Sequence, residues 1–249
     1  HLLHGINHAE VPGMLIASYT HGMDELVREH FGERYRTGLD WFFAGGGAYT
    51  QPRATLATSP RSRITVAELD PRVTETARER LFLDTAGMRV VHSDARRVLA
   101  GERGPFDVVV GDVFHDLAIP FHLVTREFAA LVRERLAPDG LYIMNAVDAF
   151  PDPRLVRTLV KTLRTEFRHV DVWMDGVPES ERVTFILTAT DDERLPLAVA
   201  ARSGFQRSWY RVTEKIEALG GGSAGLPVLT DDYAPVERLI AGLLLEGGR

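Results

Sequence analysis

The feature that most constrains the fold of this chain is a regular alternation of short apolar segments with segments of helical periodicity. The first five apolar segments are residues 38–44, 63–68, 88–92, 107–111 and 141–145. One helical pattern begins after Asp70, and two more cover residues 123–136 and 153–165. Strands that alternate with helices of about 10–15 residues are typical of βαβ units, which place their strands in a parallel sheet.

The expected sheet has two further strands and is covered on both faces. Residues 170–174 and 183–188 bring it to about seven strands, the last of them antiparallel. Segment 107–111 is almost wholly apolar, which indicates that helices lie on both sides of it. We therefore predict a doubly wound α/β domain of Rossmann-like type over residues 38–249, with helices at its C-terminal end. A short lid or strand segment over residues 1–37 precedes it.

Composition removes several classes of function. The net charge is −6, from 29 basic and 35 acidic residues, which argues against a nucleic-acid binder. The chain has no cysteine, which excludes disulfides, thiolate catalysis and cysteine-ligated zinc. No set of His, Asp and Glu has the spacing of metal ligands, so we expect no metal. No apolar run reaches the roughly 20 residues that a membrane-spanning helix needs.

Glycines and acids directly follow the first four strands of the predicted sheet. Gly45, Gly46 and Gly47 come after the first strand, and the acids Glu68, Asp94 and Asp112 come after the next three. The carboxyl ends of parallel strands meet at one edge of the sheet, where ligands bind in this type of fold. Glycines let a ligand approach the backbone, and an acid about 20 residues after them suits ribose hydroxyls. The pattern indicates a nucleoside ligand.

The glycine loop helps to separate two nucleoside classes. Its sequence is GGGAYT, which lacks the GxGxxG spacing of dinucleotide-binding proteins and favours S-adenosyl compounds. Each acid also has a less specific explanation. Glu68 can stabilise a helix start, Asp94 can cap the helix that follows it, and Asp112 can belong to a turn. We expect His115 and His122 to be loop or packing residues.

Five stretches of the sequence carry a more specific pattern. They are FFAGGGAYTQPR (42–53), VAELDPRVTETARERL (66–81), VVHSDARRVL (90–99), the segment 111–145 that contains HLVTREF, and LTDDYAPVERLI (229–240). Together they resemble the spermidine/spermine synthase family, in particular the soluble domain of bacterial proteins that fuse a transporter-like membrane part to a spermidine synthase. The resemblance covers most of residues 39–240 and implies a sheet of the class I methyltransferase type.

The resemblance implies aminopropyl transfer from decarboxylated S-adenosylmethionine to a polyamine, with release of methylthioadenosine. An aliphatic amine with a pKa near 10.4 is protonated at neutral pH, so a carboxylate must hold it and take a proton. Asp112 matches the family's catalytic acid, Glu68 the ribose-binding acid and Asp94 the adenine-binding acid. The resemblance further implies a cytoplasmic homodimer, with a membrane-embedded N-terminal half in the natural full-length protein.

Other candidate residues lie at both ends of the chain and after the fourth strand. A weak match at residues 3–8 puts His8 at a polar position that contacts the ligand in the family. For substrate binding we name Tyr19 and His21 in the N-terminal segment, Asp116 after the fourth strand, and a late turn. That turn contains Asp231, Asp232 and Tyr233.

The sequence departs from the family at two places. Ala48 stands where the family's aminopropyltransferases carry an Asp that grips the donor amine. The second acid, Asp116, follows Asp112 by four residues instead of three. S-adenosylmethionine itself is therefore an alternative donor. A methyltransferase and a non-catalytic domain that binds nucleosides or polyamines are alternative functions.

Overall fold

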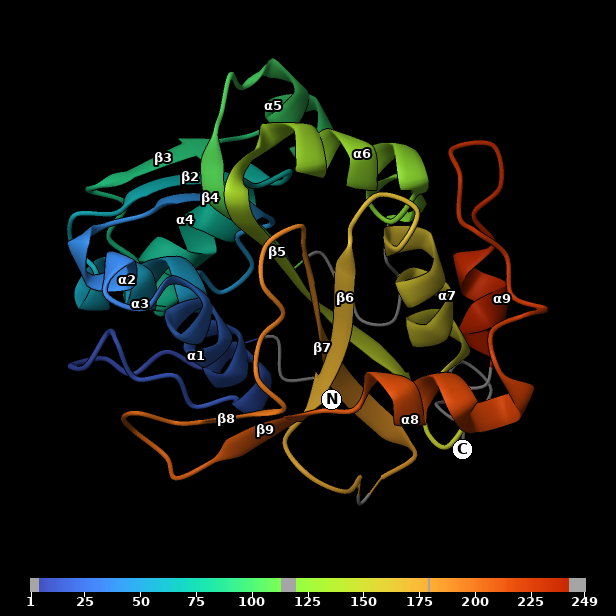
Figure 1. The fold of residues 1–249 in the computed structure, drawn as a ribbon. Helices are drawn as coiled ribbons and strands as arrows, with labels where there is room; N and C mark the ends of the chain where they lie inside the picture. Colours follow the sequence, from blue (N-terminus) through green and yellow to red (C-terminus); the bar gives the residue numbers. More distant parts are fainter. Residues whose placement is uncertain (1–4, 113–119, 179, 242–249) are drawn as a thin grey trace.

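The computed structural model describes residues 5–112, 120–178 and 180–241, and within them nine strands form one sheet (Figure 1). The strand order is β3-β2-β1-β4-β5-β7-β6-β9-β8. Strands β1 to β5 are parallel to one another, and β7 is antiparallel to both β5 and β6. The strands are β1 (Asp40–Ala44), β2 (Arg63–Ala67), β3 (Met88–Val91), β4 (Phe106–Gly111), β5 (Leu136–Ala149), β6 (His169–Met174), β7 (Arg182–Thr190), β8 (Ala198–Ala200) and β9 (Ser208–Arg211).

Helices cover both faces of the sheet, as Figure 1 shows. Helices α1, α2 and α4 contribute to the core on one face, and α5 to α9 contribute to the core on the other. None of the helices in the described ranges is long and apolar enough to cross a bilayer. The α-helices are α1 (Ser18–Phe31), α2 (Arg34–Thr37), α3 (Thr50–Thr58), α4 (Pro71–Arg80), α5 (Ala95–Gly101), α6 (Arg126–Arg135), α7 (Arg154–Leu163), α8 (Thr213–Ala218) and α9 (Val236–Leu239), and the 3-10 helices are η1 (Phe121–Leu123) and η2 (Leu219–Gly221).

Strand β1 shows why the central sheet is buried on both sides. Its side chains alternate between the two cores: Trp41 and Phe43 pack on the side of α1, and Phe42 and Ala44 pack on the side of α5 and α6. Successive residues of a strand point to opposite faces, so a wholly apolar strand fits only a sheet that is covered twice. This confirms the predicted doubly wound α/β fold with its antiparallel strand.

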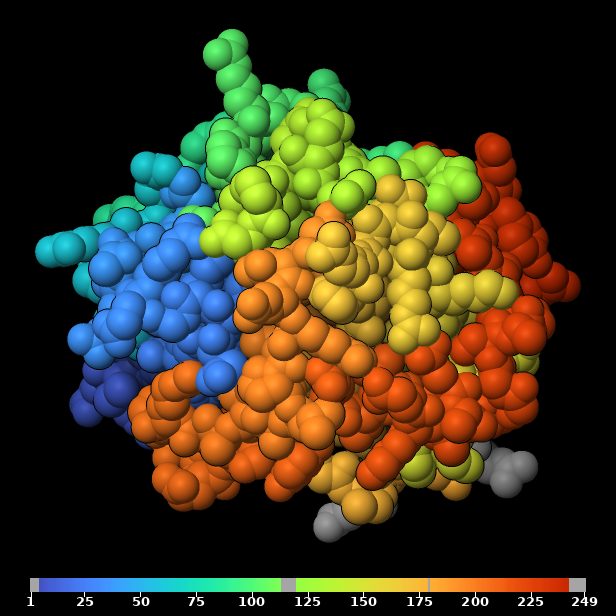
Figure 2. Space-filling model, in the orientation of Figure 1, coloured from blue at the N-terminus to red at the C-terminus, as the bar shows by residue number. Residues whose placement is uncertain are grey.

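The strand count differs from the expected seven because residues 190–249 contain more than helices. Strands β8 and β9 pair with each other, and β9 extends the sheet beyond β6. These strands have only three and four residues, too few for a period-2 pattern to be distinct in the sequence. The C-terminal third also spreads across the lower part and right side of the molecule in Figure 2.

The N-terminal segment folds mainly as a helix in the part that the structure describes. Helix α1 buries Met23, Leu26 and Val27, at the spacing that places side chains on one helix face. Its contacts reach β5, β7 and β8, so it packs on the sheet. The separate lid expected over residues 1–37 therefore stays a prediction. The expected strand is not seen in residues 5–37, the part of this segment that the structure describes.

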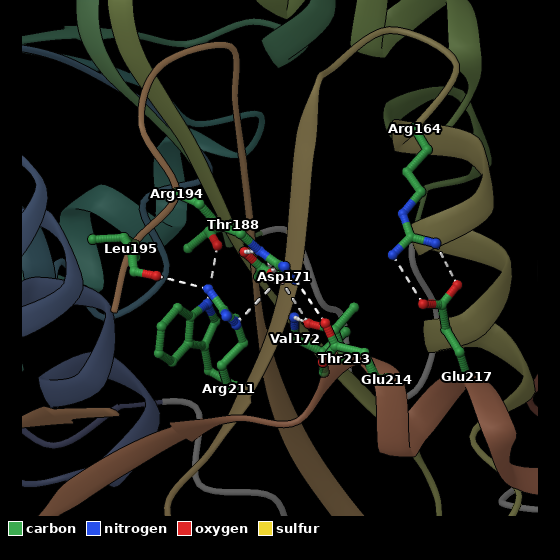
Figure 3. Close-up of polar contacts among 11 residues, drawn as sticks. Arg164, Asp171, Val172, Thr188, Arg194, Leu195, Arg211, Thr213, Glu214 and Glu217 are labelled. Carbon is green, nitrogen blue, oxygen red and sulfur yellow. Dashed lines mark hydrogen bonds and ion pairs between the residues drawn. The ribbon is translucent and has the colours of Figure 1, made fainter. Parts of the chain in front are cut away.

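A buried charge network ties the last strands to the sheet (Figure 3). The carboxylate of Asp171 on β6 is 3% exposed and accepts hydrogen bonds from the guanidinium of Arg194 and the hydroxyl of Thr213. Arg211 Nε lies 3.8 Å from the same carboxylate. Because a buried carboxylate needs charged or hydrogen-bonding partners, these contacts fix β9 and α8 against β6.

The glycine-rich segment 220–225 is held by two cations of α7. Arg157 donates to the carbonyl oxygens of Leu219 and Gly222. Lys161 Nζ donates to the carbonyl oxygen of Leu226 at 2.6 Å. Composition alone could not reveal these tertiary contacts.

Candidate active site

The carboxyl ends of β1 to β4 border one cavity of about 730 Å³, called here the nucleoside cavity. Gly45, Gly47, Glu68, Asp94 and Asp112 all line it. These residues come from four separate loops and meet because the strands before them are parallel neighbours. The structure thus brings together the acids and glycines that the sequence pattern placed at one edge of the sheet.

Glu68 holds the glycine loop by its carboxylate. Its Oε2 accepts hydrogen bonds from the amides of Gly46 and Gly47 at 2.9 and 3.2 Å, and its Oε1 accepts one from the amide of Asp70 at 3.0 Å. The side chain is buried. Glu68 therefore shapes the loop in addition to facing the cavity, and Oε1, which accepts one hydrogen bond, keeps a second lone pair for a ligand hydroxyl.

The glycine loop packs against the ring of Tyr49. A Cβ atom at Gly46 would lie 2.6 Å from the Tyr49 ring, so only glycine fits there. Tyr49 itself has a φ of 55° and donates or accepts a hydrogen bond of 2.7 Å with Thr74. Left-handed backbone at a residue other than glycine is uncommon, and it persists only where the surroundings fix it. These contacts fix the backbone conformation of the glycine loop beside the cavity.

Asp94 and His122 both line the nucleoside cavity and are hydrogen-bonded to each other. Asp94 Oδ2 is 2.7 Å from Nε2 of His122, and Oδ1 accepts the amide of Arg97 as the cap of α5. Burial raises the pKa of Asp94, but the hydrogen bonds to His122 and the helix amides outweigh it and leave the pKa below its usual range. Asp94 is thus ionised and oriented at neutral pH.

Asp112 borders a second space, called here the inner chamber, of about 10 Å³. Gly45, Ala48 and Asp112 line both this chamber and the nucleoside cavity. Tyr19 and Thr50 also line this chamber. Burial and the nearby charge of Asp112 both raise the pKa of Tyr19, so its phenol stays protonated at neutral pH.

A third hollow of about 690 Å³, called here the aromatic groove, opens beside the inner chamber. Tyr19 lines both, and Trp173 and Trp209 form the groove together with Asp175. Trp173 and Trp209 are almost wholly buried, so the exposed carboxylate of Asp175 is what the groove offers to an organic cation, and Arg182 also lines the groove. The nucleoside cavity, inner chamber and aromatic groove are therefore adjacent through shared wall residues.

His8 and His21 do not line the nucleoside cavity. Nδ1 of His8 accepts the amides of Glu10 and Val11, at 3.2 and 3.1 Å. His21 is buried, 3.6 Å from Glu25, with its ring edge-on to Trp209.

The carboxylate of Asp231 in the late turn contacts other residues of this chain. Asp231 receives two hydrogen bonds of 2.7 Å from Arg96 and one of 2.7 Å from Thr125. Asp232 and Tyr233 are exposed beside it. Asp116 lies outside the described residues. Within the described ranges, no three or more His, Asp or Glu side chains lie together as metal ligands would.

Sequence reasoning missed three features of the site. His122 was expected to be a packing residue, yet it lines the cavity and pairs with Asp94. Thr50, Trp173 and Trp209 carried no signal, because hydroxyl and aromatic side chains occur in many helices and strands. The HLVTREF stretch could have drawn attention to His122 as part of a specific motif.

Comparison with curated proteins shows a likeness to polyamine aminopropyltransferases. No model of a known protein family matches the chain. It is 27% identical over 213 residues to a probable polyamine aminopropyl transferase of Bifidobacterium longum, covering 78% of this chain and 47% of the relative. It is 30% identical to polyamine aminopropyltransferase 1 of Streptomyces coelicolor, covering 63% of this chain and 31% of the relative. The chain thus spans less than half the length of these two relatives.

Solved structures agree on the fold. A probable spermidine synthase from Corynebacterium glutamicum matches with a TM-score of 0.72 and 24% identity, covering 91% of this chain and 86% of that one. Human methyltransferase-like protein 13, in complex with SAH, matches with a TM-score of 0.58 and 23% identity over 70% of this chain and 82% of that one. The methyltransferase-type sheet expected from the sequence is confirmed. In sequence the chain is similar to polyamine aminopropyltransferases, the kind of protein that the site-bearing stretches indicate.

Proposed function

We propose that this chain transfers an aminopropyl group from decarboxylated S-adenosylmethionine to a polyamine and releases methylthioadenosine. The observation that carries the proposal is the place of Asp112, at the boundary between the nucleoside cavity and the inner chamber. A transfer reaction needs a base where the donor's reactive carbon and the acceptor's nitrogen meet.

The donor's nucleoside fits the larger cavity. Glu68 would accept a hydrogen bond from a ribose hydroxyl through Oε1, and Asp94 would accept one from the 6-amino group of adenine. Such bonds to carboxylates are charge-assisted and stronger than neutral ones. The sulfonium of the donor would then lie near Asp112, whose negative charge stabilises a positive neighbour.

The acceptor would enter from the aromatic groove. The exposed carboxylate of Asp175 can hold one ammonium of a polyamine, and Tyr19 lines both the groove and the inner chamber that contains Asp112. Asp112 would take a proton from the attacking nitrogen and align it behind the carbon next to sulfur. The carbon–nitrogen bond forms as the carbon–sulfur bond breaks, and the sulfur leaves as the neutral thioether of methylthioadenosine.

The charge of the inner chamber favours the decarboxylated donor over S-adenosylmethionine. Among its described wall residues, Asp112 is the carboxylic acid, Tyr19 is neutral and none is Lys, Arg or His. The carboxylate of S-adenosylmethionine would face a like charge there without a cationic partner. Methyl transfer from S-adenosylmethionine remains the second candidate because Ala48 removes the acid that would grip the donor's amine.

The test is Asp112→Asn, which keeps the shape of the side chain and removes the base. Steady-state turnover with decarboxylated S-adenosylmethionine and a diamine should fall by about 10²–10⁴-fold. Affinity for methylthioadenosine, measured by calorimetry, should change little because the nucleoside contacts remain. Asp84→Asn, the same chemical change at an exposed residue outside the cavity, is the control and should keep normal turnover.

Two results would reject the proposal. Near-normal turnover of Asp112→Asn would remove Asp112 from the reaction. Turnover by the unaltered chain only with S-adenosylmethionine would favour a methyltransferase, and nucleoside binding without any turnover would favour a binding domain. The homodimer, the cytoplasmic location and the membrane-embedded N-terminal half remain predictions of the family resemblance.

A further inference from the structure

Thr50, the first residue of α3, presents a buried hydroxyl to the inner chamber. The residue is 8% exposed and lines the chamber together with Ala48 and Asp112. Its Oγ1 atom is buried and has no hydrogen-bond partner among the described residues. A buried hydroxyl without a partner costs stability, so an unsatisfied one beside a ligand site indicates a ligand group that satisfies it.

The chain's N-terminal segment encloses this hydroxyl. A Cβ atom at Gly5 would lie 2.5 Å from Ala48 Cβ and 2.9 Å from Thr50 Oγ1. Any larger residue at position 5 would therefore press into the wall of the chamber. Asn7 Nδ2 donates to the carbonyl oxygen of Ala48 at 2.7 Å and holds the segment in place. The space next to Thr50 is small because protein surrounds it.

The size and charge of the chamber define the group that fits. A volume of about 10 Å³ is near the lower limit for one water molecule, which is also the size of an ammonium group. The N-terminus of α3 carries a partial positive charge, but the carboxyl group of Asp112 lines the same small space. An ammonium therefore suits the chamber, and the combined carboxylate and ammonium of an amino-acid tail does not.

We propose that Thr50 determines donor specificity: its hydroxyl accepts a hydrogen bond from the terminal ammonium of the donor's aminopropyl chain. Thr50 would thus supply part of the contact that Ala48 cannot make. This inference rests on the proposed function, because it assigns one end of the proposed donor. Ala48 has only a methyl group, and Thr50 Oγ1 is the unsatisfied buried side-chain oxygen of the chamber's described wall.

The experiment compares Thr50→Val and Thr50→Ser with the unaltered chain by calorimetric titration. The ligands are decarboxylated S-adenosylmethionine and methylthioadenosine, which lacks the aminopropyl ammonium. Thr50→Val keeps the shape and removes the acceptor, so affinity for the decarboxylated donor should fall by about tenfold or more. Affinity for methylthioadenosine should stay within about twofold, since no nucleoside contact changes. Thr50→Ser retains the hydroxyl and should bind both ligands like the unaltered chain.

Equal losses for both ligands in Thr50→Val would mean a structural role and would overturn the inference. So would an unchanged preference for the donor in Thr50→Val, or an unaltered chain that binds the donor no better than methylthioadenosine. These failures differ from failure of the proposed function, which is measured as product formation by the unaltered chain. An unaltered chain that binds neither ligand would contradict both. Melting temperatures of the variants check that each has folded.

Discussion

His122 offers a sharp test of how the nucleoside cavity is organised, through the variant His122→Ala. The imidazole Nε2 lies 2.7 Å from Asp94 Oδ2, and the His122 carbonyl accepts a hydrogen bond from Arg96 at 3.2 Å. The side chains of His122 and Asp94 are each 36% exposed. Removal of the imidazole would free one oxygen of Asp94 and let its carboxylate rotate away from the position that adenine needs.

The size of the effect follows from that one hydrogen bond. A bond to a charged group contributes about 1.5–3 kcal/mol when buried, and partial exposure with solvent screening reduces it to about 1 kcal/mol. That free energy corresponds to roughly a fivefold loss of affinity for methylthioadenosine. The hydrogen bond from His122 lowers the pKa of Asp94, so His122→Ala should raise that pKa toward its usual value.

The assay is calorimetric titration with methylthioadenosine, together with an NMR titration of the Asp94 carboxyl. His122→Gln can keep a donor near Asp94 and should restore part of the affinity. His169→Ala, at a half-buried histidine that does not line the cavity, is the control. An unchanged affinity and an unchanged Asp94 titration in His122→Ala would refute the positioning role.

Two more predictions follow from buried carboxylates. Glu68→Ala should weaken methylthioadenosine binding at least tenfold and also lower the melting temperature, because three backbone amides lose their acceptor; equal affinity by calorimetry would exclude Glu68 from the site. Burial raises the pKa of Asp148 from 3.8 to about 7, so the folded chain keeps a proton that the unfolded chain releases. The contribution of Asp148 to the free energy of unfolding therefore falls as pH rises from about 4 to 7. The difference in unfolding free energy between Asp148→Asn and the unaltered chain should rise by up to about 4 kcal/mol over that pH range, in favour of the variant. Urea titrations at pH 4 and pH 8 measure this, and a pH-independent difference would contradict it.

The convergence of the site could be predicted because it depends on strand order and direction. Glycines after β1 and acids after β2, β3 and β4 need only parallel strands to meet, and the strands were visible as apolar segments. Asp94 also shows how two explanations of one residue can both hold. It caps α5 through Oδ1 and faces His122 through Oδ2.

Contacts between distant parts of the chain could not be predicted from local pattern. Asp231 and Arg96 are far apart in sequence, and only the fold shows that their ion pair anchors the late turn. The buried hydroxyl of Thr50 depends on the approach of Gly5, which no periodicity encodes. The short strand β9 packs Trp209 into the core and places Arg211 3.8 Å from the buried Asp171 of β6, contacts that its four residues do not reveal as a pattern.

The measurement that tests the central claim most directly is mass spectrometry of the products formed by the unaltered chain. The chain is incubated with a diamine and either decarboxylated S-adenosylmethionine or S-adenosylmethionine. Aminopropyl transfer predicts equal amounts of methylthioadenosine and of an amine enlarged by one aminopropyl group, with the decarboxylated donor alone. A methylated amine with S-adenosylmethionine, or no new amine with either donor, would contradict it.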